Sequence, residues 1–133
     1  MKVRAQVEGL GILAIFAALL AKDTLVSITG NRTVNKAGAD AVVIGRVSKP
    51  AKAVNGNGSV ETRFKELIEI KASGAVAAGD RVKLAAADGV TGENRATKWT
   101  SQTDAVAGDK PDSLFGVCWN GGADGATIEV LTY

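Results

Sequence analysis

The stretch "VETRFKELIEIKA", Val60 to Ala72, decides the fold class, because its composition and its pattern disagree. Glu, Lys and Leu favour a helix. In an extended chain, however, apolar residues alternate with charged ones, as half-buried strands do. One face would carry Val60, Thr62, Phe64, Ile68, Ile70 and Ala72, and the other Arg63, Lys65, Glu69 and Lys71. We therefore predict a strand, in which Glu66 is the one break in the apolar face.

The segments on either side support the same fold class. "TLVSI", "AVVIGRV" and "RVKLA" are short and rich in β-branched residues, and turn sequences such as "NGNG", "ADG" and "NGGADG" separate such runs. The last residues, "TIEVLTY", have apolar side chains on both faces, which indicates a terminus paired inside a sheet. We predict an all-β protein, a small β-sandwich or barrel with an apolar N-terminal arm or short helix.

The opening stretch "EGLGILAIFAALLAKD", Glu8 to Asp23, allows several interpretations. Its uncharged run spans only residues 9–21, too short for a membrane helix of about 20 residues. A signal peptide with its cleavage site at Ala21 would need a small residue two positions earlier, and that position holds Leu19. "GLGILA" matches a dinucleotide-binding turn, but no acidic residue follows at the required distance. An apolar segment covered by its own core or by a partner subunit is left.

We accordingly divide the chain into an apolar N-terminal arm or helix, residues 1–24, and a β-rich domain, residues 25–133. The arm and two aromatic residues outside it are the predicted interface, since tryptophan and other aromatics are common interface residues. Trp99 lies in the most loop-like part of the chain and Tyr133 at its end. The predicted interface residues are Leu10, Ile12, Leu13, Ile15, Phe16, Leu19, Leu20, Trp99 and Tyr133.

The composition excludes several kinds of chemistry. The 133 residues include no histidine, which removes His-dependent catalysis and His-ligated metal sites. Cys118 lies in the apolar run "LFGVCW", where a thiol is usually buried. We expect no catalytic residues, no bound metal and no cofactor. A net charge of +2 and six aromatics argue against nucleic-acid binding, and we expect no membrane contact. The charge is uneven, +5 over residues 1–71 and −3 over 72–133, which suits association with neighbours.

Two segments in the C-terminal half resemble a known family. They are "AVAAGDRVKLAAADGVTG", Ala75 to Gly92, and "LFGVCWNGGADGATIEVLTY", Leu114 to Tyr133. An Ala-Gly-Asp turn leading into a short strand, and a hydrophobic-Gly-Val strand before the last hairpin, are similar to the capsid cement, or head-decoration, proteins of tailed bacteriophages. "VIGRVSKPAKA", Val43 to Ala53, adds to this resemblance.

The resemblance implies a structural function in the virion. Proteins of this family sit on the outer surface of the assembled head, often as trimers at local three-fold positions, and clamp neighbouring major-capsid subunits. It therefore implies that this chain is not an enzyme, that its partners are the major capsid protein and itself, and that it is made in the host cytoplasm. The alternative left by the residues is a small β-barrel module that binds nucleic acid or a cell-surface partner.

Overall fold

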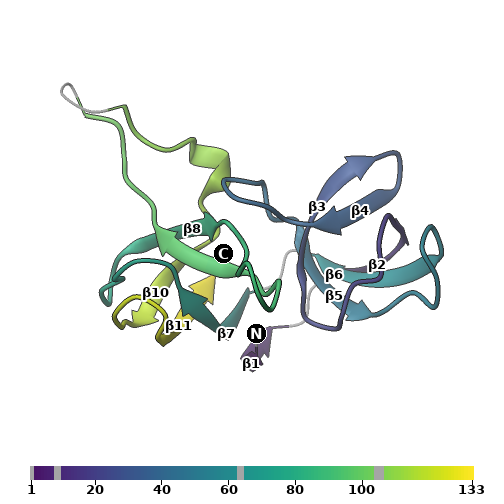
Figure 1. Ribbon diagram of the computed structural model, residues 1–133, viewed down its shortest axis with the longest axis horizontal. Coiled ribbons are helices and arrows are strands. Elements are labelled where there is room, and N and C mark those ends of the chain that lie inside the picture. Colours follow the sequence, from purple (N-terminus) through teal and green to yellow (C-terminus); the bar gives the residue numbers. More distant parts are fainter. Residues whose placement is uncertain (1, 8–9, 63–64, 104–106) are drawn as a thin grey trace.

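The computed structural model describes residues 2–7, 10–62, 65–103 and 107–133, with the backbone alone for residues 2–7 and Leu10. Every regular element in these residues is a β-strand, apart from one turn of 3-10 helix at Pro111–Ser113. The prediction of an all-β fold is confirmed. Figure 1 shows two barrels side by side, and the sequence predicted only one.

The first barrel, on the right of Figure 1, contains five strands that close in the order β2-β4-β3-β5-β6. They are β2 (Leu10–Phe16), β3 (Leu25–Gly30), β4 (Thr33–Lys36), β5 (Gly45–Lys49) and β6 (Asn57–Thr62). Alternating side chains point into the barrel, as the pleat of a strand requires. Phe16, Val26, Val47 and Val60 are fully buried and form the centre of its core.

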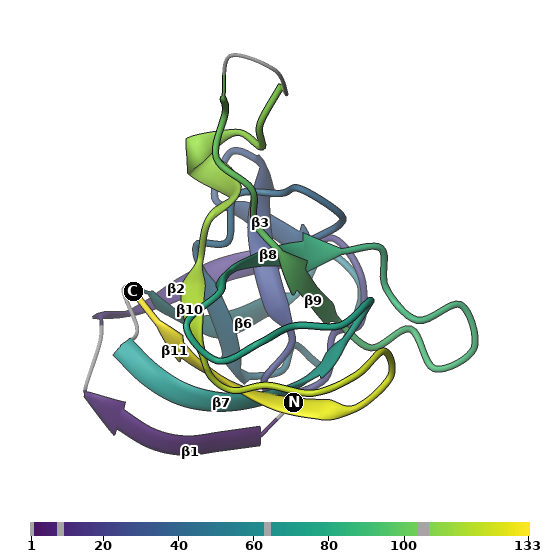
Figure 2. The same cartoon turned by 90° about the vertical axis from the view of Figure 1, so that its left-hand side faces the viewer.

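The second barrel contains β7 (Lys65–Ala72), β8 (Arg81–Ala85), β9 (Arg95–Lys98), β10 (Gly116–Asn120) and β11 (Thr127–Thr132). They form a sheet in the order β7-β11-β10-β8-β9, and a contact between β9 and β7 closes it. The first strand of the chain, β1 (Lys2–Val7), pairs with β7 on the outside of this barrel, as Figure 2 shows. As predicted, the C-terminal strand is paired inside a sheet, between β7 and β10.

The two barrels have the same topology, with β2 to β6 corresponding in order to β7 to β11. In each, the first and third strands are parallel and all other pairs are antiparallel. The registers also correspond. Ile15 and Phe16 pair with the start of β4, and Lys71 and Ala72 pair in the same way with the start of β9. The chain is therefore an internal structural repeat.

Hydrogen bonds outside the strand ladders repeat as well. The N–H of Asp23 donates to Val47 O over 2.8 Å, and the N–H of Gly79 donates to Cys118 O over the same distance. Asp23 and Gly79 both have a positive φ, 70° and 88°, so the turn after the first strand has one geometry in both barrels. The segments "LLAKDTLV" (19–26) and "AVAAGDRV" (75–82) occupy equivalent positions.

A glycine opens the fourth strand of each barrel for the same steric reason. A Cβ on Gly45 would lie 2.1 Å from the carbonyl oxygen of Glu61, and a Cβ on Gly116 would lie 2.6 Å from that of Leu131. Both glycines therefore allow the fourth strand to approach the fifth more closely than any other residue would.

Two sequence predictions differ from this arrangement. Residues 10–16 of the predicted arm or helix form strand β2, which is a structural member of the first barrel, so the boundary expected at residue 24 does not separate two units. The described residues of the predicted strand 60–72 are in strands, but they belong to β6 of one barrel and β7 of the other, and Arg63 and Phe64 lie outside the described residues. The chain passes from barrel to barrel between them.

Apolar and polar contacts join the barrels. Leu25 and Ala37 of the first barrel are buried in the core cluster of the second. The side chain of Asn94 accepts a hydrogen bond from Leu25 N and donates one to Ala37 O, at 3.0 and 3.2 Å. The N–H of Asp40 donates to Leu84 O over 3.1 Å. These contacts hold the barrels as one body.

Candidate interaction surface

The predicted interface residues of the opening stretch lie in three kinds of environment. Phe16 and Leu20 are buried in the core of the first barrel, 0% and 6% exposed, so the folded chain cannot present them to a partner. Ile15 is half-buried, and the side chain of Leu10 lies outside the described residues. Ile12, Leu13 and Leu19 are exposed.

The exposed members do not form one patch. Leu13 lines a shallow hollow with Lys49, Pro50 and the turn around Gly56, whereas Leu19 lines a groove between the barrels. Other apolar side chains of the first barrel are exposed too, at Ile28, Val42 and Val54. The surface of this barrel is therefore rich in apolar contact points, on more than one side.

Trp99 has a structural role at the base of a long loop. Its indole N–H donates to Lys110 O over 3.0 Å, and the guanidinium of Arg81 lies 5.7 Å from the centre of its ring. It is only half exposed. These contacts join the two ends of the loop segment that projects at the upper left of Figure 1.

The second barrel exposes an aromatic residue that the sequence analysis did not select. Trp119 on β10 is 63% exposed, beside a register shift between Cys118 and Asn120. Leu131 on the neighbouring strand and Tyr133 after it are also exposed. Cys118 is buried and the next residue of β10, Trp119, is exposed, which is the alternation expected of a strand, so the predicted burial of Cys118 was a signal that could have found Trp119. Trp119 is the largest exposed apolar side chain among the described residues.

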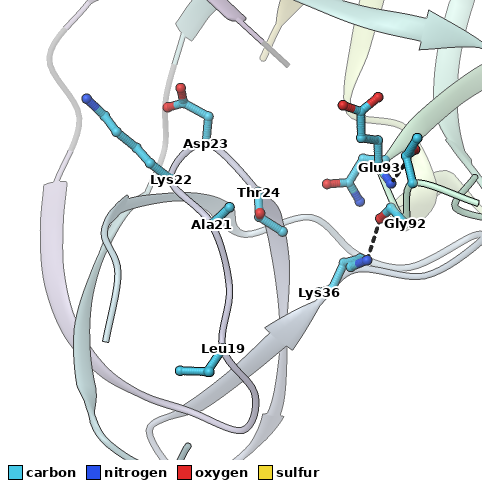
Figure 3. A pocket seen from close by; sticks show the side chains of 10 residues that line it. Leu19, Ala21, Lys22, Asp23, Thr24, Lys36, Gly92 and Glu93 are labelled. Carbon is cyan, nitrogen blue, oxygen red and sulfur yellow. Dashed lines mark hydrogen bonds between the residues drawn. The ribbon is translucent and has the colours of Figure 1, made fainter. Parts of the chain in front are cut away.

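A groove of about 350 Å³ separates the barrels and is lined by residues of both. In Figure 3, Asp23, Thr24 and Lys36 of the first barrel lie on one side of the groove and Gly92 and Glu93 of the second lie on the other, while the side chain of Lys22 points away from the second barrel. The ammonium of Lys36 donates to Gly92 O across the groove. This hydrogen bond therefore links the two barrels.

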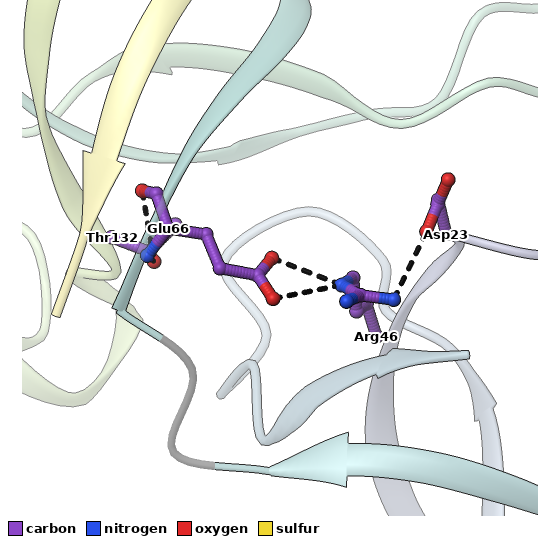
Figure 4. A network of polar contacts seen from close by, with 4 residues as sticks. All are labelled: Asp23, Arg46, Glu66 and Thr132. Atoms are coloured by element: carbon purple, nitrogen blue, oxygen red, sulfur yellow. Dashed lines mark hydrogen bonds and ion pairs between the residues drawn. The ribbon is translucent and has the colours of Figure 1, made fainter. Parts of the chain in front are cut away.

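Glu66, which interrupts the predicted apolar face, connects the second barrel to the first. Its side chain is fully buried, and its two carboxylate oxygens share the Nε–H of Arg46 in a bifurcated hydrogen bond, at 3.0 and 2.9 Å. Arg46 lies on β5 of the first barrel and also binds Asp23 Oδ1 over 3.1 Å, as Figure 4 shows. The hydroxyl of Thr132 accepts the Glu66 N–H over 2.8 Å. The ion pair thus crosses from one barrel to the other.

Electrostatics stabilise the charged form of this arginine. Burial alone would lower the pKa of Arg46, but the hydrogen bond and charge of Glu66, with the charges of Asp23 and Glu61, outweigh it and raise the pKa. A buried charge is tolerated when it is paired and hydrogen-bonded in this way. We assign the network a structural role.

A second ion-pair cluster joins the same two barrels. Lys83 Nζ lies 2.5 Å from Asp109 Oδ1 and 2.6 Å from Asp40 Oδ1. Hydrogen bonds to Asp109 and then Asp40 raise the pKa of Lys83. The bond from Lys83, followed by the N–H of Thr100, lowers the pKa of Asp109. Lys83 therefore ties the long loop of the second barrel to the first.

The lowered pKa of Asp109 makes this tie sensitive to acid. A carboxylate with a lowered pKa contributes stability above its ordinary pKa of about 3.9, and that contribution is lost as the pH falls through the lowered value. Asp109→Asn should mimic protonation at neutral pH and accelerate hydrogen exchange of the Thr100 amide. Asp112→Asn, on the exposed 3-10 turn, is the control and should leave that rate unchanged. Unchanged Thr100 exchange in Asp109→Asn would contradict this role.

The described residues show no candidate metal site. They contain no group of three or more Cys, Asp or Glu side chains that could hold a metal ion. Cys118 is buried, and burial raises the pKa of its thiol, which keeps it protonated and unreactive at neutral pH. No helix in the described part of the chain has the length and hydrophobicity needed to cross a lipid bilayer.

Comparison with solved structures finds a protein with the same two-barrel fold. The crystal structure of the head fiber gp8.5 N base in bacteriophage phi29 matches 96% of this chain and 94% of its own, with a TM-score of 0.54 and 14% sequence identity. The fold is that of a phage head fiber base. No family model matches the sequence, and no curated protein shows significant similarity to it. At this identity, the comparison establishes the fold.

The match covers both barrels of the chain. A comparison that spans nearly all of both proteins includes the internal repeat and the placement of one barrel beside the other. The resemblance to phage decoration proteins, by contrast, rests mainly on the second half of the sequence.

Proposed function

We propose that this protein is a structural component of a tailed-phage virion that binds the outer surface of the assembled head. The observation that carries the proposal is the two-barrel match to a phage head fiber base over nearly the whole chain. The sequence resemblance to decoration proteins points to the same place in the virion. A described surface with exposed apolar side chains and no candidate metal cluster fits a binding role.

The partner in this proposal is the major capsid protein, and the chain acts as a homotrimer at local three-fold positions. Two rigidly joined barrels give each copy two separate surfaces, so one copy can contact neighbouring coat subunits and clamp them. Many weak contacts repeated over a shell multiply the stabilisation, and a protein that binds only the assembled lattice favours that lattice.

Co-sedimentation tests the proposal directly. Heads assembled without this chain should bind the purified protein with a fixed and saturable number of copies, and unassembled coat subunits should not. Electron microscopy of the decorated heads should place it outside the shell. Binding to an oligonucleotide with equal affinity, and none to heads, would favour the nucleic-acid module instead.

A further inference from the structure

Strand β2 of the first barrel has an open edge. Its partner β4 pairs only with Ile15 and Phe16, because the β3–β4 hairpin turns at residues 31–32, just before β4 begins. The backbone groups of Gly11 and Leu13 point to the same side as those of Ile15, away from β6. No strand pairs with this side of residues 10–13 in the described part of the chain.

The equivalent edge in the second barrel is filled by β1. There, β9 pairs only with Lys71 and Ala72, and β1 pairs with the rest of β7, from Lys65 to Glu69. By the register of the repeat, Leu67 corresponds to Gly11 and Glu69 to Leu13. The second barrel thus has an added strand at a position that is open in the first.

Side chains at the open edge of β2 and at the equivalent edge of β7 differ in their burial. Ile12 and Ile68 are equivalent, and alternation places both toward the barrel interior. Ile68 is 0% exposed, whereas Ile12 is 37% exposed, and Leu13 beside it is 68% exposed. An inward apolar side chain with this much exposure indicates that the first barrel lacks a covering strand.

We propose that the outer edge of β1 from a second copy of this chain adds to this open edge of β2. In the described residues, β1 pairs with β7 alone, so its other edge is free to accept a strand. Unpaired strand edges are templates for strand addition. The contact would extend the sheet of the second barrel of one copy into the first barrel of the next.

The contact joins two different surfaces, the open edge of β2 on one copy and the outer edge of β1 on the next, in a head-to-tail arrangement. A contact between unlike surfaces generates a closed ring when its rotation closes. The inference rests on the self-association in the proposed function and names its surface.

Leu13→Pro tests the backbone contact. Proline removes an N–H that points to the open edge, and edge strands tolerate proline at such positions. Leu13→Thr is the control, since it keeps the N–H and a strand-forming side chain. Sedimentation velocity over a dilution series, repeated on head-bound protein after cross-linking, should show association at least about tenfold weaker for Leu13→Pro than for Leu13→Thr. Circular dichroism checks that both variants fold.

Single-cysteine variants test the same contact even if Leu13→Pro misfolds. In a Cys118→Ala background, a mixture of Leu13→Cys and Gln6→Cys proteins should form a disulfide-linked pair on oxidation, and neither should do so alone. Cross-linking of Leu13→Cys with itself, or of no pair, would overturn the inference. Head binding by a protein that never cross-links would overturn this contact and leave the proposed function standing; absence of head binding with the cross-link present would do the reverse.

Discussion

Glu66→Gln is expected to lower the free energy of unfolding by about 3 kcal/mol, a large part of the 5–15 kcal/mol typical of a domain. The change keeps the shape of the side chain and removes its charge, which leaves Arg46 buried beside a neutral amide. Removing one partner of a buried ion pair costs about 3–5 kcal/mol, and the lower end applies because Asp23 still contacts Arg46. Chemical denaturation gives the value.

Two further variants test the cause of the loss. Asp23→Asn should cost about 1 kcal/mol or less, because the Asp23 side chain is 23% exposed and makes the longer contact. The double variant Arg46→Met with Glu66→Leu should regain most of the stability, since apolar residues often replace a buried pair without loss. A Glu66→Gln protein as stable as the wild type would mean that the pair does not hold the barrels together.

This network also shows what the sequence could and could not predict. Alternation identified β7 correctly and marked Glu66 as the exception on its inward face. The partner of Glu66 is 20 residues away, on another barrel. Alternation within one strand carries no information on such a contact, so the isolated inward acid was visible and its ion pair was not.

The internal repeat is not visible in the sequence because the two barrels share a backbone geometry but few identical residues. In the equivalent segments 19–26 and 75–82, only Ala21/Ala77 and Val26/Val82 are identical. The two cores are also filled differently. Phe16 packs where a Cβ on Gly58 would lie 2.6 Å from its ring, whereas the equivalent pair in the second barrel is Ala72 and Ile128. The large core side chain comes from the first strand in one barrel and from the fifth strand in the other. A residue-by-residue comparison of the two sequences does not detect this exchange.

The apolar opening stretch was recognised as a segment in need of cover, but whether it forms an extended arm or a helix was left open. Its side chains are apolar on both faces, so neither a helical nor a strand period stands out. Ala14 and Phe16 point inward in β2, and Leu13 points outward. Which of the predicted interface residues are exposed therefore depends on the register of β2, and pairing with β4 and β6 defines that register.

Phe16→Asp is expected to produce a misfolded, insoluble protein in the absence of any capsid. The ring is fully buried in the first barrel, and an unpaired carboxylate in that position has neither water nor a cation near enough to compensate. Phe16→Ala should be the milder variant, with a loss of about 3–5 kcal/mol, because truncation leaves a cavity. Gly58 contributes no side chain to fill it.

Leu19→Ala and Leu19→Asp are the matched controls. Leu19 belongs to the same stretch but is 65% exposed, so both variants should fold with stabilities within about 0.5 kcal/mol of the wild type. Solubility, circular dichroism and denaturation, measured beside head co-sedimentation, separate the roles. A soluble, folded Phe16→Asp protein that had lost only head binding would show that this side chain serves the partner and not the barrel core. A folded Leu19→Asp protein that failed to bind heads would assign docking to the exposed part of the stretch.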